Sequence, residues 1–324
     1  MRLTSLNPNI RIISPAAKNA EQEETQSPRR YLERPCLPRQ GLRLRQTPRL
    51  NVNVAVLRAT THKSTSAPPE YRVAAILLLN EDFPLICVDS LVARLHKTTN
   101  AFVALKCLFS LHNIILQDWS LPRDSKGSVV GGHNELNVRT FNDRFDAEST
   151  EYSSWVRWYA EVLEENVVAS GNLGRRLFYR RTSKEDEMRV RESFDEDLIS
   201  ELGALASLLE RLANVPRSLH LQRNELVCKI VTSVRQDYRV IRRETTLRME
   251  ELSRRAEGMK VRELSRFLAE LGRVEGCEER LVAIFSNKAN NDGLWEEIAK
   301  TRRRVWMLIQ ERSRDSWVPR LTLH

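Results

Sequence analysis

Four basic side chains within a fifteen-residue segment form the part of the sequence best suited to hold an anion. They are Arg58, His62, Lys63 and Arg72. The segment is rich in Ser, Thr and Pro and separates two predicted helices. Helix N-termini direct unpaired N–H groups outward, where phosphate binds well. We therefore predict a phosphate-binding turn, while an ordinary surface turn carrying four basic residues would have the same composition.

Catalytic chemistry has little support in the sequence. The motifs of nucleophilic hydrolases, of nucleotide-phosphate loops and of zinc-binding helices are absent. The six histidines are dispersed, with no pair at i, i+4 spacing. His112 falls on the apolar face of a predicted helix, where a hydrogen-bonded core histidine is the usual role. We predict a protein that is not an enzyme, with no catalytic residue, no metal site and no cofactor.

The composition favours an all-helical fold that is soluble and has few turns. Only 11 of the 324 residues are glycine and 6% are aromatic, while 41% are hydrophobic and 29% charged. No run of about 18 apolar residues is present, so we expect no transmembrane segment. Five widely spaced cysteines predict buried, reduced thiols rather than disulfides or zinc ligands.

Positive charge is concentrated at the start of the chain. The net charge is +9, and residues 1–50 contribute +6 of it through ten Lys/Arg and four Glu. Six of the twelve prolines also fall within residues 1–51, and that density interrupts helices. We predict a disordered basic arm over 1–51; a transit peptide or an incorrect gene start would be alternative explanations.

The rest of the chain shows the spacing of amphipathic helices joined by short connections. This predicts a stack or solenoid of antiparallel helices over 52–312, followed by a short tail over 313–324. Trp155, Trp158 and Tyr159 share one helix face, which favours core packing. A long polar loop is expected over 117–146. The predicted helices cover 52–60, 70–79, 91–116, 153–169, 195–212, 223–256, 261–285 and 294–312.

The basic turn and two later stretches together resemble the ANTH domains of clathrin-assembly proteins. Residues 57–62, Leu-Arg-Ala-Thr-Thr-His, and the prolines after them match a lipid-binding motif that reads approximately K-A-T-x-H, then proline and a basic K-x-K-H cluster. Residues 95–115 are similar to the family's third-to-fourth-helix region, and 153–160 to its later tryptophan/tyrosine helix. Over about residues 52–310 the chain resembles a divergent, short plant member.

The resemblance implies an ANTH/ENTH-like superhelical stack that binds phosphatidylinositol 4,5-bisphosphate. The lipid would be held by the four basic residues of the turn. Clathrin and vesicle SNARE helices are implied as further partners. The implied location is cytoplasmic and peripheral, on clathrin-coated pits or vesicles at the plasma membrane or Golgi.

The chain departs from the family motif after the two prolines. Arg58 stands in place of the first lysine and His62 matches, but Glu70-Tyr71-Arg72 replaces the basic cluster. Each Lys or Arg near an anionic surface contributes about 1 kcal/mol, so losing two predicts an affinity ~10–1000-fold weaker. The sequence end carries no recognisable clathrin-binding peptide.

Three functions from different classes therefore remain open. The first is a non-catalytic phosphoinositide-binding adaptor in clathrin-mediated endocytosis, coat assembly and vesicle trafficking. The second is a helical protein-interaction scaffold, for example for SNAREs, with degraded lipid selectivity. The third is nucleic-acid binding through the basic arm, which is disfavoured because Tyr31 is the arm's only aromatic residue.

Overall fold

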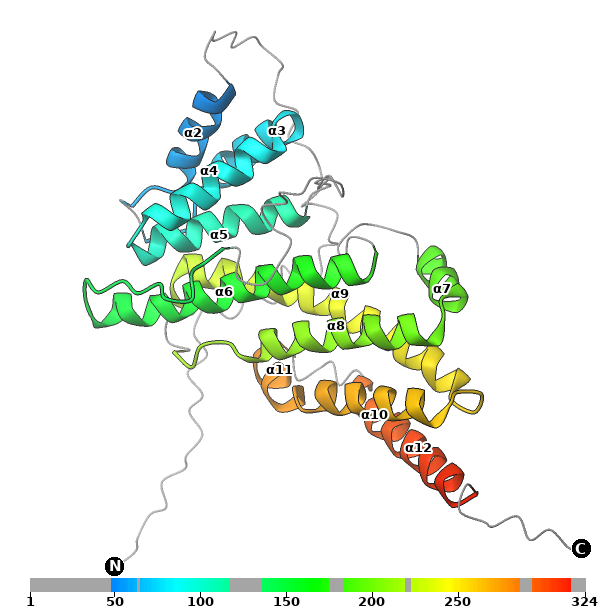
Figure 1. Cartoon of the computed structure of the whole chain (residues 1–324). Coiled ribbons are helices and arrows are strands. Elements are labelled where there is room, and N and C mark those ends of the chain that lie inside the picture. Colours follow the sequence, from blue (N-terminus) through cyan, green and yellow to red (C-terminus); the bar gives the residue numbers. More distant parts are fainter. Residues whose placement is uncertain are drawn as a thin grey trace, which may run out of the picture. The chain divides into compact units, whose positions relative to one another are not determined.

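Helices make up the regular structure of this protein wherever it is described. A computed structural model describes residues 48–62, 65–116, 136–174, 177, 183–218, 223–285 and 293–315. Figure 1 shows the helices in chain order. The predicted all-α class is confirmed. The helices are α2 Pro48–Ala59, α3 Glu70–Asp82, α4 Pro84–Lys97, α5 Ala101–Leu116, α6 Ala147–Asn172, α7 Ser183–Glu192, α8 Asp195–Ala213, α9 Glu225–Arg255, α10 Val261–Glu275, α11 Glu278–Phe285 and α12 Leu294–Asp315.

The two predicted ends of the helical domain each shift by a few residues. α2 begins at Pro48, within the segment predicted as the arm, because proline suits the first turn of a helix where its missing N–H is not needed. α12 continues to Asp315, beyond the predicted end at residue 312. Residues 1–47 and 316–324 lie outside the described residues, as does most of the predicted loop over 117–146. The arm and the tail therefore remain predictions.

Neighbouring helices pack largely in chain order. α2 and α3 lie on α4 and α5, α5 packs on α6, and α6 packs on α8. α8 also contacts α9 and α10, and α12 packs on α10 (Figure 1). All of these helices belong to one compact unit formed by residues 46–324. The predicted helical stack is confirmed.

Two of the predicted helices are each divided in two. The apolar spacing predicted a single helix over 91–116, but α4 ends at Lys97 and α5 begins at Ala101. Asn100 Oδ1 accepts the Val103 N–H at 3.0 Å, and Asp143 Oδ2 accepts the Ala101 N–H at 2.8 Å. These acceptors stabilise a new helix start although the apolar face continues across it. The helix predicted over 261–285 likewise divides into α10 and α11 at residues 276–277.

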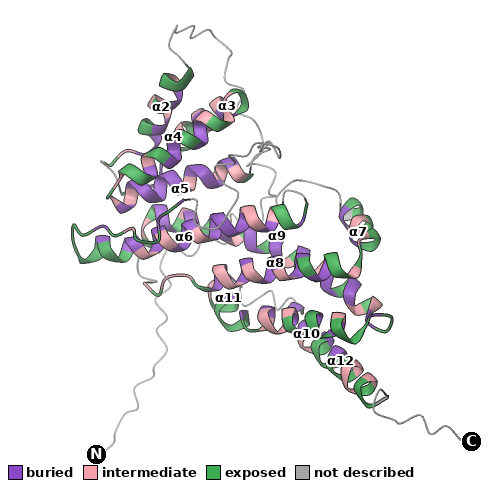
Figure 2. Ribbon diagram, in the orientation of Figure 1, coloured by how far each residue is buried: buried purple, intermediate pink, exposed green. Residues whose placement is uncertain are grey.

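The predicted aromatic core is confirmed. Trp155, Trp158 and Tyr159 on α6 are buried, as Figure 2 shows for much of that helix. The Tyr159 hydroxyl and His112 Nδ1 share a 2.7 Å hydrogen bond, and His112 Nε2 lies 2.8 Å from Asp237 Oδ2. His112 is thus a core histidine with polar partners, as predicted. These contacts join α5, α6 and α9 through groups that are costly to bury alone.

The cysteine prediction is correct at three described positions and wrong at one. The cysteines described are free, and Cys87, Cys107 and Cys277 are buried. Burial raises the pKa of Cys107 to about 12. Cys228 is exposed instead, because it lies on the outer side of α9. Cys36 lies outside the described residues.

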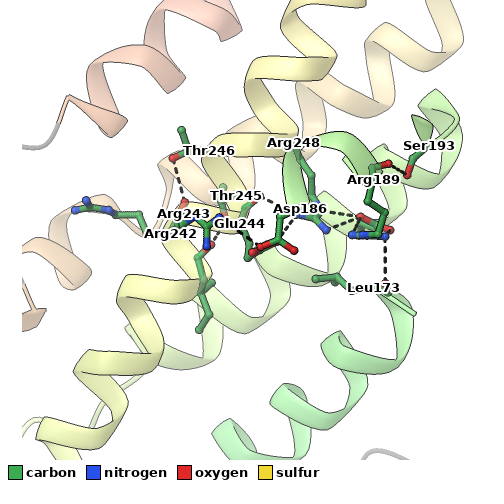
Figure 3. Close-up of polar contacts among 12 residues, drawn as sticks. Leu173, Asp186, Arg189, Ser193, Arg242, Arg243, Glu244, Thr245, Thr246 and Arg248 are labelled. Carbon is green, nitrogen blue, oxygen red and sulfur yellow. Dashed lines mark hydrogen bonds and ion pairs between the residues drawn. The ribbon is translucent and has the colours of Figure 1, made fainter. Parts of the chain in front are cut away.

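A cluster of buried charges joins α7, α8 and α9 (Figure 3). Arg248 on α9 is fully buried, and its Nε donates to Glu201 Oε2 on α8 at 2.7 Å. Its Nη1 donates to Glu244 Oε2 at 2.8 Å. Arg189 on α7 lies 3.2 Å from Glu201 Oε1. Each buried carboxylate therefore faces a guanidinium, which offsets the cost of removing both from water.

α7 was not predicted from the sequence. Its ten residues, SKEDEMRVRE, contain two apolar side chains, too few to define an amphipathic face. It is attached instead by charge: Arg189 contacts Glu201, and Arg243 on α9 lies 3.3 Å from Asp186. Val190 is buried against the core. Tertiary ion pairs, which have no sequence signature, thus hold this helix in place.

Candidate functional site

The predicted phosphate-binding turn is formed by the end of α2 and the start of α3. Thr60 follows the last residue of α2, and both its N–H and its hydroxyl donate to the Val56 carbonyl, at 2.9 and 2.7 Å. Pro69 precedes α3 and fixes an extended approach to the helix. The turn therefore places the C-terminus of one helix beside the N-terminus of the next.

Two cations hold the carbonyl groups at the end of α2. Arg72 Nη1 donates to the Arg58 carbonyl at 2.8 Å, and Lys106 Nζ donates to the Thr61 carbonyl at 2.9 Å. Helix C-termini carry partial negative charge and unpaired carbonyls, which cations stabilise. The two bonds tie the end of α2 to α3 and to α5.

The structure brings two of the four predicted residues into direct contact. Arg58 is exposed in the last turn of α2, and Arg72 is half-buried in the first turn of α3. His62 is exposed in the turn itself. Lys63 lies outside the described residues. The hydrogen bond between Arg72 and the Arg58 backbone joins positions fourteen residues apart in sequence.

Arg72 retains capacity to bind an anion. A guanidinium has five N–H donors. Two of them are used within the described structure: Nη1 on the Arg58 carbonyl and Nε on the Tyr71 hydroxyl at 3.2 Å. Among the described residues no carboxylate lies within ion-pair distance of Arg58 or Arg72. Their positive charges are therefore not neutralised by a neighbouring side chain in that part of the chain.

The start of α3 offers backbone donors next to these charges. Pro69 provides no side-chain hydrogen bond to the first turn, and its carbonyl accepts from Arg72 N at 2.9 Å. By helix geometry the N–H groups of Glu70 and Tyr71 have no acceptor within the helix. An anion at this end would also meet the positive end of the helix dipole. Glu70, which is exposed here, opposes it with one negative charge.

Lys106 on α5 bonds to the turn, and sequence reasoning did not identify this residue. Its side chain is 1% exposed, within the otherwise apolar helix α5. Burial lowers its pKa, and the positive charge of Arg72 lowers that pKa further. A single lysine inside an apolar helical run is a usable signal, because a buried ammonium must find an acceptor. The acceptor itself, on a turn 45 residues away, could not be identified from spacing.

Comparison with known proteins gives concordant matches. The ANTH-domain family profile matches residues 51–289. The chain is 32% identical over 259 residues to “Putative clathrin assembly protein At4g40080” of Arabidopsis thaliana, covering 76% of this chain and 70% of that protein. It is 27% identical over 244 residues to “Putative clathrin assembly protein At5g10410” of the same plant, covering 72% and 71%.

Proposed function

Because the chain belongs to the ANTH-domain family, we propose that it is a non-catalytic adaptor that binds phosphoinositide headgroups and takes part in clathrin-coat assembly. Relatives named as clathrin assembly proteins support the coat role. None of the helices described combines the length and apolar character needed to cross a bilayer. Membrane association in this proposal is therefore peripheral.

The observation that carries the proposal is the pairing of Arg58 and Arg72 beside the open N-terminus of α3. Arg72 Nη1 reaches the Arg58 backbone carbonyl at 2.8 Å, so the Arg72 guanidinium lies beside the residue that carries the second positive charge. Phosphomonoesters are well matched by guanidinium donors and backbone N–H groups used together. We propose that Arg58, His62, Lys63 and Arg72 contact the headgroup phosphates. Lys106 would support the turn through its bond to the Thr61 carbonyl.

The proposed affinity is modest. Glu70 and Tyr71 occupy positions where the family motif has basic residues. With about 1 kcal/mol for each Lys or Arg near an anionic surface, their absence weakens binding by about fivefold each. The proposal therefore needs a measurement that separates lipid selectivity from total charge.

The test is vesicle co-sedimentation of the full chain on two vesicle types of matched surface charge. One contains phosphatidylinositol 4,5-bisphosphate and the other phosphatidylserine. Wild type should prefer the first. Arg58→Glu changes the local charge by two, so binding to the first should fall about 30-fold, or ~2 kcal/mol.

Arg303→Glu on α12 provides the matched control. Arg303 is exposed, so this substitution makes the same change in net charge far along the chain from the turn. It should lower binding to both vesicle types slightly and equally. A wild type without preference, or an Arg58→Glu variant that still discriminates, would contradict the proposed site. SNARE-helix binding without lipid dependence would then favour a protein-interaction scaffold.

A further inference from the structure

Two large apolar side chains border the basic turn and are left uncovered. Leu57, in the last turn of α2, is 51% exposed, and Tyr71, in the first turn of α3, is 67% exposed. The opposite side of α2 is packed normally, with Val52, Val56 and Ala59 buried. Single exposed apolar residues are common on protein surfaces, so exposure alone assigns nothing.

Arg72 connects the Tyr71 side chain to the charged part of the turn. Its guanidinium lies 5.7 Å from the centroid of the Tyr71 ring, and its Nε donates to the Tyr71 hydroxyl at 3.2 Å. The same guanidinium bonds the carbonyl of Arg58, the residue that follows Leu57. The Tyr71 ring therefore borders the Arg72 guanidinium, and Leu57 is the sequence neighbour of the residue whose carbonyl that guanidinium binds.

This combination matches the chemistry of a bilayer interface. Anionic phosphates lie at the level of the headgroups, with apolar acyl chains directly beneath. Tyrosine is enriched at that boundary because its ring is apolar and its hydroxyl is polar. A soluble phosphate or an acidic peptide would engage Arg58 and Arg72 but would leave Leu57 and Tyr71 in water. Charge complementarity together with the exposed apolar pair thus favours a membrane as the occupant.

We infer that Leu57 and Tyr71 insert into the interfacial layer of an anionic membrane while Arg58 and Arg72 contact the phosphates above them. This inference rests on the proposed function and adds an apolar component to it. Tyr71 then contributes contact that does not depend on charge, at a position where the family motif has basic residues. Binding to vesicles should accordingly persist at salt concentrations that weaken the purely electrostatic contribution.

The experiment compares the full chain with the double variant Leu57→Ala/Tyr71→Ala. Two ligands are used: soluble inositol 1,4,5-trisphosphate, measured by calorimetry, and vesicles containing phosphatidylinositol 4,5-bisphosphate, measured by co-sedimentation at 0.1 and 0.5 M salt (about 10 and 4 Å screening lengths). Headgroup affinity should stay within about twofold, whereas vesicle affinity should fall about tenfold or more at both salt concentrations.

Met307→Ala is the matched control. Met307 on α12 is 52% exposed, close to the value for Leu57, and α12 packs on α9 and α10 rather than on α2 or α3. This variant should retain wild-type vesicle binding. Because all three side chains are exposed, circular dichroism should show unchanged folding.

The outcomes separate this inference from the function on which it rests. Wild-type selectivity for the bisphosphorylated lipid with unchanged vesicle binding by the double variant would overturn insertion and leave the proposed function standing. Equal loss of headgroup and vesicle affinity would also overturn insertion, because the residues would then act on the phosphate site. A wild type that binds neither ligand would overturn both.

Discussion

The turn between α2 and α3 and the charged cluster joining α7, α8 and α9 use arginine in opposite settings. Arg72 is half-buried, and its described partners are a backbone carbonyl and an aromatic side chain. Arg248 is fully buried between two carboxylates, Glu201 and Glu244. The first arrangement leaves positive charge available to a ligand. The second neutralises it and joins helices.

Less buried arginine–carboxylate pairs recur through the later helices. Arg255 contacts Asp195 and Arg273 contacts Glu210, each at 2.8 Å. Arg304 lies 2.7 Å from Glu257. The comparison teaches that the net charge of +9 does not locate a binding surface. Arg58 and Arg72 have no carboxylate within ion-pair distance among the described residues, and the N-terminus of α3 lies beside them, so unpaired charge and helix end together define the candidate site.

The largest effect should come from breaking the buried cluster. Arg248→Met removes the buried guanidinium that contacts both Glu201 and Glu244, and Glu201 keeps only its outer contact with Arg189, so the free energy of unfolding should fall by about 3–5 kcal/mol. Urea titration monitored by circular dichroism measures this free energy of unfolding. Arg254→Met, on the same helix but 66% exposed, should cost less than about 1 kcal/mol. Equal losses in the two variants would contradict the distinction.

Lys106→Met tests whether the turn depends on its buried cation. The Thr61 carbonyl loses a 2.9 Å bond, so stability should fall by about 1–3 kcal/mol. Vesicle affinity should also fall, by about fivefold or ~1 kcal/mol, because the turn loses its support. Thermal unfolding and co-sedimentation provide the two measurements. A variant that is destabilised but keeps full lipid affinity would show that Lys106 contributes to the fold and not to lipid binding.

Arg72→Lys separates charge from geometry within the turn. Lysine keeps the positive charge but cannot span the Arg58 carbonyl and the Tyr71 hydroxyl with a planar fork. Stability should fall by about 1 kcal/mol, as for loss of a typical hydrogen bond. Vesicle binding should fall less than in Arg72→Ala, as measured by co-sedimentation. Identical binding by the two variants would indicate that charge at this position does not contribute.

The smallest effect should come from Glu70→Gln, and it should be a gain. Removing the negative charge at the start of α3 should raise vesicle affinity by about fivefold. Stability should fall by only about 0.3–1 kcal/mol, since an acidic residue favours a helix N-terminus. Co-sedimentation at rising salt should show the gain shrinking through screening. If vesicle affinity did not rise at low salt, the headgroup phosphates would not bind at the N-terminus of α3.

Sequence reasoning identified the helical elements well where apolar spacing defined them. α8, α9 and α12 were expected within a few residues of their observed bounds, because their leucines and valines repeat at helical spacing. The same periodicity missed the break at residues 98–100, where a cap from Asp143 starts a new helix. It also missed α7, whose attachment depends on ion pairs to α8 and α9.

For the candidate site, the sequence by itself determined the residue types and their order around two helix ends. Those features follow from local chemistry: prolines and Ser/Thr end helices, and basic side chains attract phosphate. Only the tertiary structure decided that Arg72 reaches the Arg58 carbonyl, that Lys106 on α5 supports the turn, and that Leu57 and Tyr71 remain exposed. The physical reason is that contacts and burial depend on how helices distant in sequence pack together, which local periodicity does not encode.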